Sequence, residues 1–147
     1  MVVAVGNIAD GLVAKIKERI PNLVMGVTDD ESTELGPVIG YENKKRIYSF
    51  IESAEPDGAK LVVDGRIQSD KLEGCFVGPT LIDNVKPGMS VYDYEIFGPV
   101  LSFVRADSYD HAMKIAHTHK LGNGAALFTR DGGCLLYTSD AADEKRW

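Results

Sequence analysis

The strongest constraint on the fold is that short β-branched segments alternate with longer amphipathic ones. Helical spacing of apolar side chains is found over residues 8–20, 42–54 and 109–119. The apolar runs that predict buried strands cover residues 2–5, 61–63, 100–104 and 125–129. Because alternating strands and helices bury their apolar faces best as one covered sheet, we expect an α/β fold with a largely parallel sheet flanked by helices.

Two segments depart from this simple alternation. Over residues 75–85, apolar and polar residues alternate only loosely. This stretch contains Pro79, whose nitrogen cannot donate a hydrogen bond to a neighbouring strand. We therefore expect an edge strand or a bulge there. Residues 22–40 lose all periodicity and predict a long ordered loop, a type of segment that often carries function in compact domains.

The charge and the cysteine content exclude several classes of protein. The net charge of −6 argues against a nucleic-acid partner, and the basic run Lys44-Lys45-Arg46 is interpreted as the solvated face of a helix. The apolar start MVVAV is too short to span a membrane, so no membrane partner is expected. Cys75 and Cys134 lack the spacing of a disulfide framework, which favours a reducing, cytoplasmic location.

The histidines and the acidic run near residue 30 raise the question of a metal site. His117 and His119 are two residues apart, a spacing that places them on different sides of a helix, and no paired ligand completes a set. The acidic residues lack the order and the central glycine of a calcium loop. We therefore predict no metal ligand in this chain.

The last residues differ in character from the rest of the chain. After Asp131-Gly132-Gly133 the sequence reads CLLYTSDAADEKRW, which resembles a translated sequencing-library adapter. We therefore predict that residues 1–133 are the native region and that residues 134–147 are a non-native tail. The tail contains the only tryptophan, Trp147, which is excluded from functional reasoning for that reason.

The segment EIFGPV, residues 95–100, is the clearest candidate for a site. The carboxylate of Glu95 can accept two hydrogen bonds from neighbouring hydroxyls, as in a ribose diol. If the backbone is extended, Phe97 points to the same side as Glu95. Gly98 allows close backbone approach and Pro99 fixes its own φ. The same hexapeptide is also compatible with an ordinary entry into a strand.

This segment and others in the same order resemble the aldehyde dehydrogenase superfamily. The matching stretches are ELGPVI at 34–39, GAKL at 58–61, FVGPTL at 76–81, EIFGPV at 95–100 and GNGAALFT at 122–129. Within the superfamily, the chain is most similar to the CoA-acylating methylmalonate- or malonate-semialdehyde dehydrogenases. That likeness rests on VVAVGNIADGLV at residues 2–13 and on the asparagine in GNGAALFT.

The resemblance implies specific roles. Glu95 would hold the hydroxyls of the nicotinamide ribose of NAD, and Phe97 would pack near the nicotinamide. A cysteine, expected upstream of Met1, would attack the small semialdehyde substrate and form a thioester. The thioester would then pass to coenzyme A, the co-substrate, and propanoyl-CoA or acetyl-CoA would arise with loss of carbon dioxide. Cys75 is interpreted as a small buried hydrophobic residue, not as a nucleophile.

The same resemblance sets the expected organisation of the protein. Residues 1–133 would be part of a catalytic domain, and the resemblance places the nucleotide-binding domain upstream; the chain itself contains no G-x-G-x-x-G segment. The isolated chain is expected to be inactive, and the parent protein is expected to be a dimer or a tetramer. Two alternatives stay open: a hydrolytic aldehyde dehydrogenase that releases a carboxylic acid, and a non-catalytic structural or interaction member of the family.

Overall fold

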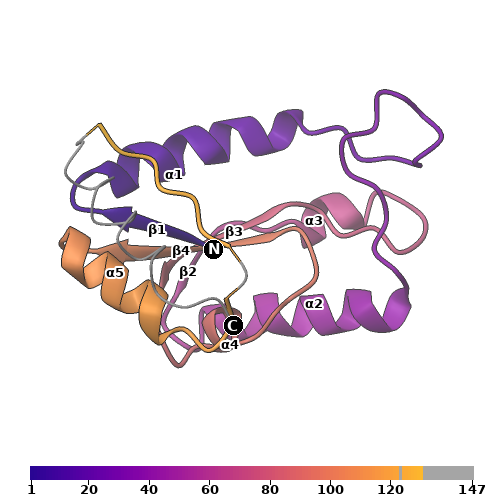
Figure 1. The fold of residues 1–147 in the computed structure, drawn as a ribbon. Helices are drawn as coiled ribbons and strands as arrows, with labels where there is room; N and C mark the ends of the chain where they lie inside the picture. The colour runs from indigo at the N-terminus through magenta and orange to yellow at the C-terminus, as the bar shows by residue number, and fades with distance from the viewer. Residues whose placement is uncertain (123, 131–147) are drawn as a thin grey trace.

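A mixed four-stranded sheet forms the centre of the computed structural model, which describes residues 1–122 and 124–130 (Figure 1). Its strands, in the order β1-β4-β3-β2, are Val2–Val5, Val100–Ala106, Thr80–Val85 and Lys60–Val63. Strand β4 pairs in parallel with both β1 and β3, whereas β2 pairs antiparallel to β3. The expected α/β fold with a largely parallel sheet is therefore confirmed.

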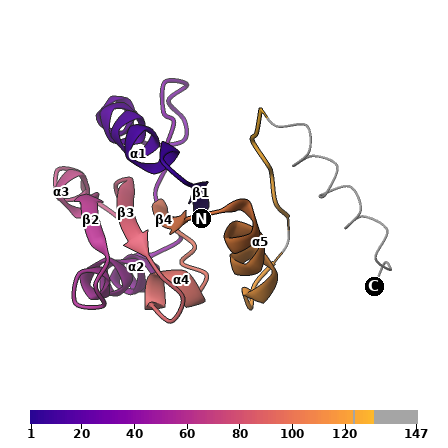
Figure 2. The same ribbon diagram turned by 90° about the vertical axis from the view of Figure 1, so that its left-hand side faces the viewer.

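Helices cover both faces of the sheet (Figures 1 and 2). On one face lies α1 (Ile8–Arg19), which continues into the short 3₁₀ helix η1 (Ile20–Asn22). The other face is covered by α2 (Tyr41–Ala54), α4 (Ser90–Asp93) and α5 (Tyr109–Thr118). A further short helix, α3 (Arg66–Ser69), follows β2.

Each face of the sheet has its own apolar core, because successive residues of a strand point to opposite faces. Leu81 and Phe103 pack with Val13 of α1 on one face. Their strand neighbours Ile82 and Val104 pack on the other face, where the buried residues of α2, α4 and α5 are found. The side chains of Leu81, Ile82 and Phe103 have no exposed surface.

The sequence placed most of these elements correctly, but its view of β3 needs a correction. Strand β3 is not an edge strand, because it pairs with β2 on one side and with β4 on the other. Pro79 is compatible with this position because it precedes the first residue of the strand and so removes no bond from the ladder. The expected bulge is confirmed by shifts of register along both pairings and by the positive φ of Asn84.

The strand predicted at residues 125–129 is wrong. This segment has no regular structure, pairs with neither edge strand of the described sheet, and is exposed throughout. Phe128 is 93% exposed, so its ring is not buried against the described sheet as the side chain of a buried strand would be. The predicted tail, residues 134–147, lies outside the described residues. Among the residues that are described, no helix is long and apolar enough to cross a membrane.

Candidate functional site

The segment singled out from the sequence lies in a loop between α4 and β4, and polar side chains of α2 bind its backbone. We refer to residues 94–98 as the 94–98 loop. The guanidinium of Arg46 donates from Nη1 to the carbonyl of Glu95 (3.1 Å) and from Nη2 to the carbonyl of Ile96 (2.6 Å). Asn43 donates from Nδ2 to the carbonyl of Phe97 (3.3 Å). Three consecutive carbonyls of the loop therefore accept hydrogen bonds from one helix.

The two ends of the 94–98 loop pack on the same helix. The Tyr94 ring lies 6.1 Å from the Phe50 ring, between centroids, in a tilted arrangement. At the other end, a Cβ added to Gly98 would lie only 2.5 Å from Cδ1 of Ile47, so any larger residue would push the loop off the helix. The side chain of Ile96 belongs to the same core as Ile47. Every residue from Tyr94 to Gly98 thus contacts α2.

Phe97 has an unusual conformation, which corrects one expectation. Its φ is +52°, in the left-handed region that residues with a Cβ seldom adopt. The loop is therefore not extended at this point, and the expected alignment of Glu95 and Phe97 on one side of an extended strand does not follow. The Phe97 side chain is 72% exposed, and Glu95 is exposed as well. Both side chains are consequently available to a ligand.

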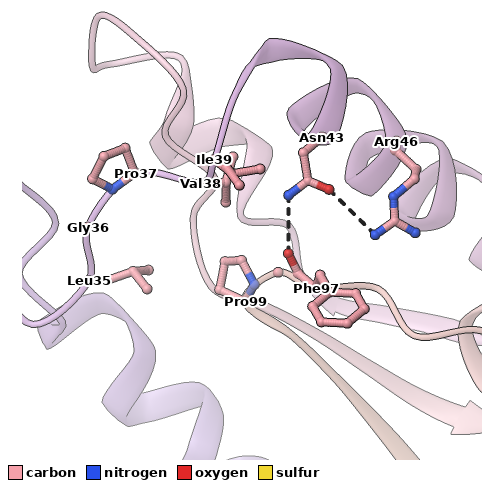
Figure 3. A pocket seen from close by; sticks show the side chains of 10 residues that line it. Leu35, Gly36, Pro37, Val38, Ile39, Asn43, Arg46, Phe97 and Pro99 are labelled. Atoms are coloured by element: carbon pink, nitrogen blue, oxygen red, sulfur yellow. Dashed lines mark hydrogen bonds between the residues drawn. The ribbon is translucent and has the colours of Figure 1, made fainter.

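An open pocket of about 720 Å³ lies beside this loop. One of its walls is Phe97, Gly98 and Pro99, another is Asn43 and Arg46 of α2, and the third is the stretch 35–39 (Figure 3). A second, smaller pocket of about 410 Å³ also includes Leu35, Gly98 and Pro99. The lining is mostly apolar, with a few polar groups at one side, which is the usual composition of a small-molecule site.

The long loop predicted at residues 22–40 supplies the third wall and is held by its own contacts. A carboxylate oxygen of Glu34 accepts a hydrogen bond from the backbone N–H of Val24 (3.0 Å). Met25 and Leu35 form an isolated bridge between the two arms of the loop. The backbone N–H of Val38 donates to the carbonyl of Cys75 (2.9 Å), which ties the end of the loop to the segment before β3. These contacts order the stretch 35–39 beside the pocket.

Several other residues discussed from the sequence have different surroundings from those expected. The basic run is not a uniformly solvated helix face, because the Arg46 guanidinium binds the 94–98 loop while Lys44 donates to the carbonyl of Gly74 (3.3 Å). Only Lys45 is fully exposed, in an ion pair with Glu42. Cys75 is a free thiol and is half-buried rather than buried.

The histidines lie away from this pocket. His119 contacts the carbonyl of Tyr92 through Nε2 (2.9 Å) and accepts a hydrogen bond from the backbone N–H of Leu121 at Nδ1 (3.0 Å). It therefore connects the end of α5 to α4, a structural contact that the sequence did not indicate. Within the described part of the chain, no group of three or more His, Cys, Asp or Glu side chains is arranged to hold a metal ion.

The chain is therefore part of an α/β domain. Its pocket lies beside the loop that connects α4 to β4. The family model described as the aldehyde dehydrogenase family matches residues 1–143, and the chain belongs to this family. It is 47% identical over 130 residues to malonate-semialdehyde dehydrogenase 3 of Geobacillus kaustophilus, covering 88% of this chain and 27% of that protein. It is 42% identical over 137 residues to malonate-semialdehyde dehydrogenase 1 of Shouchella clausii, covering 93% and 28% of the two chains.

Solved structures give the same result. The methylmalonate-semialdehyde dehydrogenase of Oceanimonas doudoroffii superposes with a TM-score of 0.89 at 43% identity, covering 94% of this chain and 29% of that one. A candidate methylmalonate-semialdehyde dehydrogenase of Sinorhizobium meliloti 1021, crystallised with NAD, superposes with a TM-score of 0.87 at 43% identity and the same coverage. The family resemblance seen in the sequence is confirmed, and the chain spans less than a third of the length of these relatives.

Proposed function

We propose that this chain is part of an NAD-dependent, CoA-acylating dehydrogenase that oxidises malonate or methylmalonate semialdehyde. The reaction would proceed through a thioester on a cysteine upstream of Met1 and would give acetyl-CoA or propanoyl-CoA with loss of the substrate carboxylate as carbon dioxide. The observation that carries the proposal is the exposure of Phe97 at the wall of the pocket and of Glu95 two residues before it in the same loop. The names of its relatives, malonate- and methylmalonate-semialdehyde dehydrogenases, support the substrate class.

The residues beside the pocket fit the nicotinamide riboside half of NAD. An ionised carboxylate at Glu95 can accept hydrogen bonds from both hydroxyls of a ribose. The exposed ring of Phe97 offers a flat apolar surface, and the apolar walls of the pocket, with a volume of about 720 Å³, suit a planar ring system. In the described residues of this chain, these two side chains are our candidates for contact with the cofactor.

The chemical contribution of this segment would be to hold the nicotinamide riboside half of NAD in position. Bound NAD would supply the hydride acceptor. Glu95 would fix the ribose, and Phe97 would restrict where the attached ring can lie. Hydride transfer depends on the reacting atoms being held close together, so a small displacement of either side chain costs rate.

The remaining features of the proposal concern the whole protein. Coenzyme A would be the acceptor of the acyl group, the enzyme would assemble as a dimer or a tetramer, and it would be located in the cytoplasm. To test the reaction, the source DNA would be sequenced across both ends of this reading frame and the complete protein would be expressed. CoA-dependent formation of acyl-CoA is the expected result. Release of free acid alone, or a complete protein without a nucleophilic cysteine, would contradict the proposal.

We predict that Glu95→Gln impairs the use of NAD and leaves the transfer to CoA intact. The test protein is a chimera in which this chain replaces the aligned region of the Geobacillus kaustophilus enzyme. Glutamine keeps the size and one acceptor but loses the charge, so KM for NAD should rise or hydride transfer should slow by about tenfold. Single-turnover kinetics would separate this step from thioester transfer to CoA.

The control for this prediction is Glu18→Gln, which removes an equally exposed carboxylate on α1, on the other face of the sheet. We expect this variant to retain the kinetics of the unmodified chimera. Unchanged kinetics of both steps in the Glu95→Gln chimera would rule out the role assigned to Glu95.

A further inference from the structure

We propose that Arg46 is a positioning residue for the cofactor site: it fixes the backbone of the 94–98 loop so that Glu95 and Phe97 face the ligand. This inference rests on the proposed function and adds a residue that touches neither the substrate nor the cofactor. Its basis is the pair of hydrogen bonds from one guanidinium to the successive carbonyls of Glu95 and Ile96, at 3.1 and 2.6 Å.

The guanidinium is suited to this task and is itself held in place. Its planar array of N–H donors can reach two neighbouring carbonyls at once, which a lysine ammonium on a flexible stem cannot do in a fixed geometry. Nη2 of Arg46 also lies 3.4 Å from Oδ1 of Asn43, and its Cζ lies 5.3 Å from the centroid of the Phe50 ring. The cation is therefore supported by one neighbour before it and one neighbour after it along α2 while it binds the loop.

Asn43 extends the same arrangement by one residue. Its Nδ2 donates to the carbonyl of Phe97, and its Oδ1 faces Arg46, so the two side chains form one continuous set of contacts (Figure 3). Asn43, Arg46 and Phe50 recur at helical spacing and so share one face of α2. That face is the one that meets the 94–98 loop.

The backbone conformation explains why the loop needs this support. A phenylalanine with φ of +52° is strained relative to its common conformations. Such a conformation persists only when its surroundings hold it. Without the bonds to the carbonyls before Phe97, the chain could relax toward an unstrained φ, and the side chains of Glu95 and Phe97 would change direction. Arg46 would therefore control where Glu95 and Phe97 point, although its own side chain binds only backbone.

The first test compares Arg46→Met with Lys45→Met in the chimera defined above. Lys45 is the neighbouring residue on the same helix, is exposed, and forms an ion pair with Glu42; among the described residues, no hydrogen bond joins its side chain to the loop. We expect Arg46→Met to raise KM for NAD by about tenfold while KM for the semialdehyde stays unchanged, because a displaced loop affects one ligand and not the other. Lys45→Met should change neither constant, and Arg46→Lys should fall between the two.

A double substitution distinguishes action through Glu95 from general damage. If Arg46 works by placing Glu95, the chimera with both Arg46→Met and Glu95→Gln should be little worse than Glu95→Gln alone, since the second change removes what the first one positions. Fully additive losses would show that Arg46 acts independently and would overturn the inference. If Glu95→Gln impairs NAD use and Arg46→Met does not, the proposed function stands and the positioning role fails.

A second measurement needs no enzyme activity. In the 147-residue chain, the backbone N–H of Val100 donates to the carbonyl of Gly98 (2.8 Å), so its hydrogen exchange reports on the end of the loop. We expect Arg46→Met to accelerate this exchange by about tenfold and Lys45→Met to leave it unchanged. Equal exchange rates in the two variants would overturn the inference whether or not the proposed function is correct.

Discussion

Gly65→Ala is expected to be the most destabilising single-methyl change in the described part of this chain, with a loss of about 3 kcal/mol or more in the free energy of unfolding. The added Cβ would overlap the backbone carbonyl of Gly78 and would lie 2.7 Å from Oγ1 of Thr80. Because the nearest atoms belong to backbone, no side-chain rotation can relieve the clash. Urea unfolding of the chain, followed by circular dichroism, measures the effect.

The backbones of Gly65 and Gly78 meet at a buried junction that is held by hydrogen bonds, which is why the clash is costly. The N–H of Gly65 donates to Oγ1 of Thr80 (3.0 Å), the hydroxyl of Ser69 donates to the carbonyl of Gly65 (2.9 Å), and the N–H of Gly78 donates to Oγ of Ser69 (2.8 Å). Separating the two backbone segments breaks these bonds in a place where water cannot replace them.

The matched control is Gly11→Ala, in the middle of α1. A Cβ at Gly11 meets nothing within 4 Å, and alanine loses less backbone entropy in a helix than glycine, so this change should stabilise the fold by about 0.5–1 kcal/mol. The two substitutions add the same methyl group, and their effects on the free energy of unfolding should have opposite signs. A small effect of Gly65→Ala, comparable with that of Gly11→Ala, would contradict the close packing of the two backbones.

The same junction also reaches the candidate site. Thr80 begins β3, and its backbone N–H donates to the carbonyl of Pro99 (2.8 Å), which lines the pocket beside Phe97. A displacement at Gly65 would therefore be transmitted through one hydrogen bond to the end of the 94–98 loop. If the proposed function is correct, Gly65→Ala should therefore also raise KM for NAD in the chimera.

The sequence predicted the longer elements well because their signal is local. Helix α2 shows its buried face through Ile47, Ile51 and Ala54 at helical spacing, and Ser108 accepts a hydrogen bond from the backbone N–H of His111 as an N-cap does. The four-residue helices α3 and α4 were not predicted, because one turn is too short to show a period. The interior position of β3 could not be predicted either, since pairing on both sides depends on segments remote in sequence.

The candidate site was predicted only in part for the same reason. Glu95 and Phe97 were proposed as site residues through the family resemblance, which compares short contiguous stretches. Arg46 and Asn43 act on the loop across about fifty residues of sequence, so no local pattern shows their contacts. The one available signal was the shared helix face of Asn43, Arg46 and Phe50. Arg46, however, lies in the basic run that was interpreted as a solvated helix face.

An ion pair on the α1 side of the sheet carries the second large prediction. Arg105 of β4 donates from Nε and Nη2 to the two carboxylate oxygens of Asp83 on β3, at 3.0 and 2.7 Å, and from Nη2 to Asp10 of α1 at 2.7 Å. The side chain of Asp83 is only 4% exposed, whereas that of Arg105 is 36% exposed. One cation thus connects two neighbouring strands to the helix that covers them.

Arg105→Met should lower the free energy of unfolding by about 2 kcal/mol at neutral pH. Removing the cation leaves the carboxylate of Asp83 buried with only the backbone N–H of Asn84 as a partner (2.7 Å). The loss is smaller than for a fully buried pair because Arg105 is partly solvated. Arg19→Met, an exposed arginine at the end of α1, serves as the control and should change stability by less than about 0.5 kcal/mol.

The pH dependence of this loss identifies Asp83 as its origin. Burial alone raises the pKa of Asp83, but the hydrogen bonds from Arg105 and Asn84 outweigh it, and the folded-state pKa lies below the ordinary value. The pair therefore contributes fully above about pH 4, near the unfolded-state pKa, and its contribution disappears as the pH falls through the folded-state pKa. In Arg105→Met, the hydrogen bonds and the charge of Arg105 no longer lower that pKa, so the favourable contribution of Asp83 above this pH range should be reduced. Urea midpoints measured between about pH 3 and pH 6 should show the gap between the two proteins widening with pH. A constant gap would mean that the substitution acts through lost packing and not through Asp83.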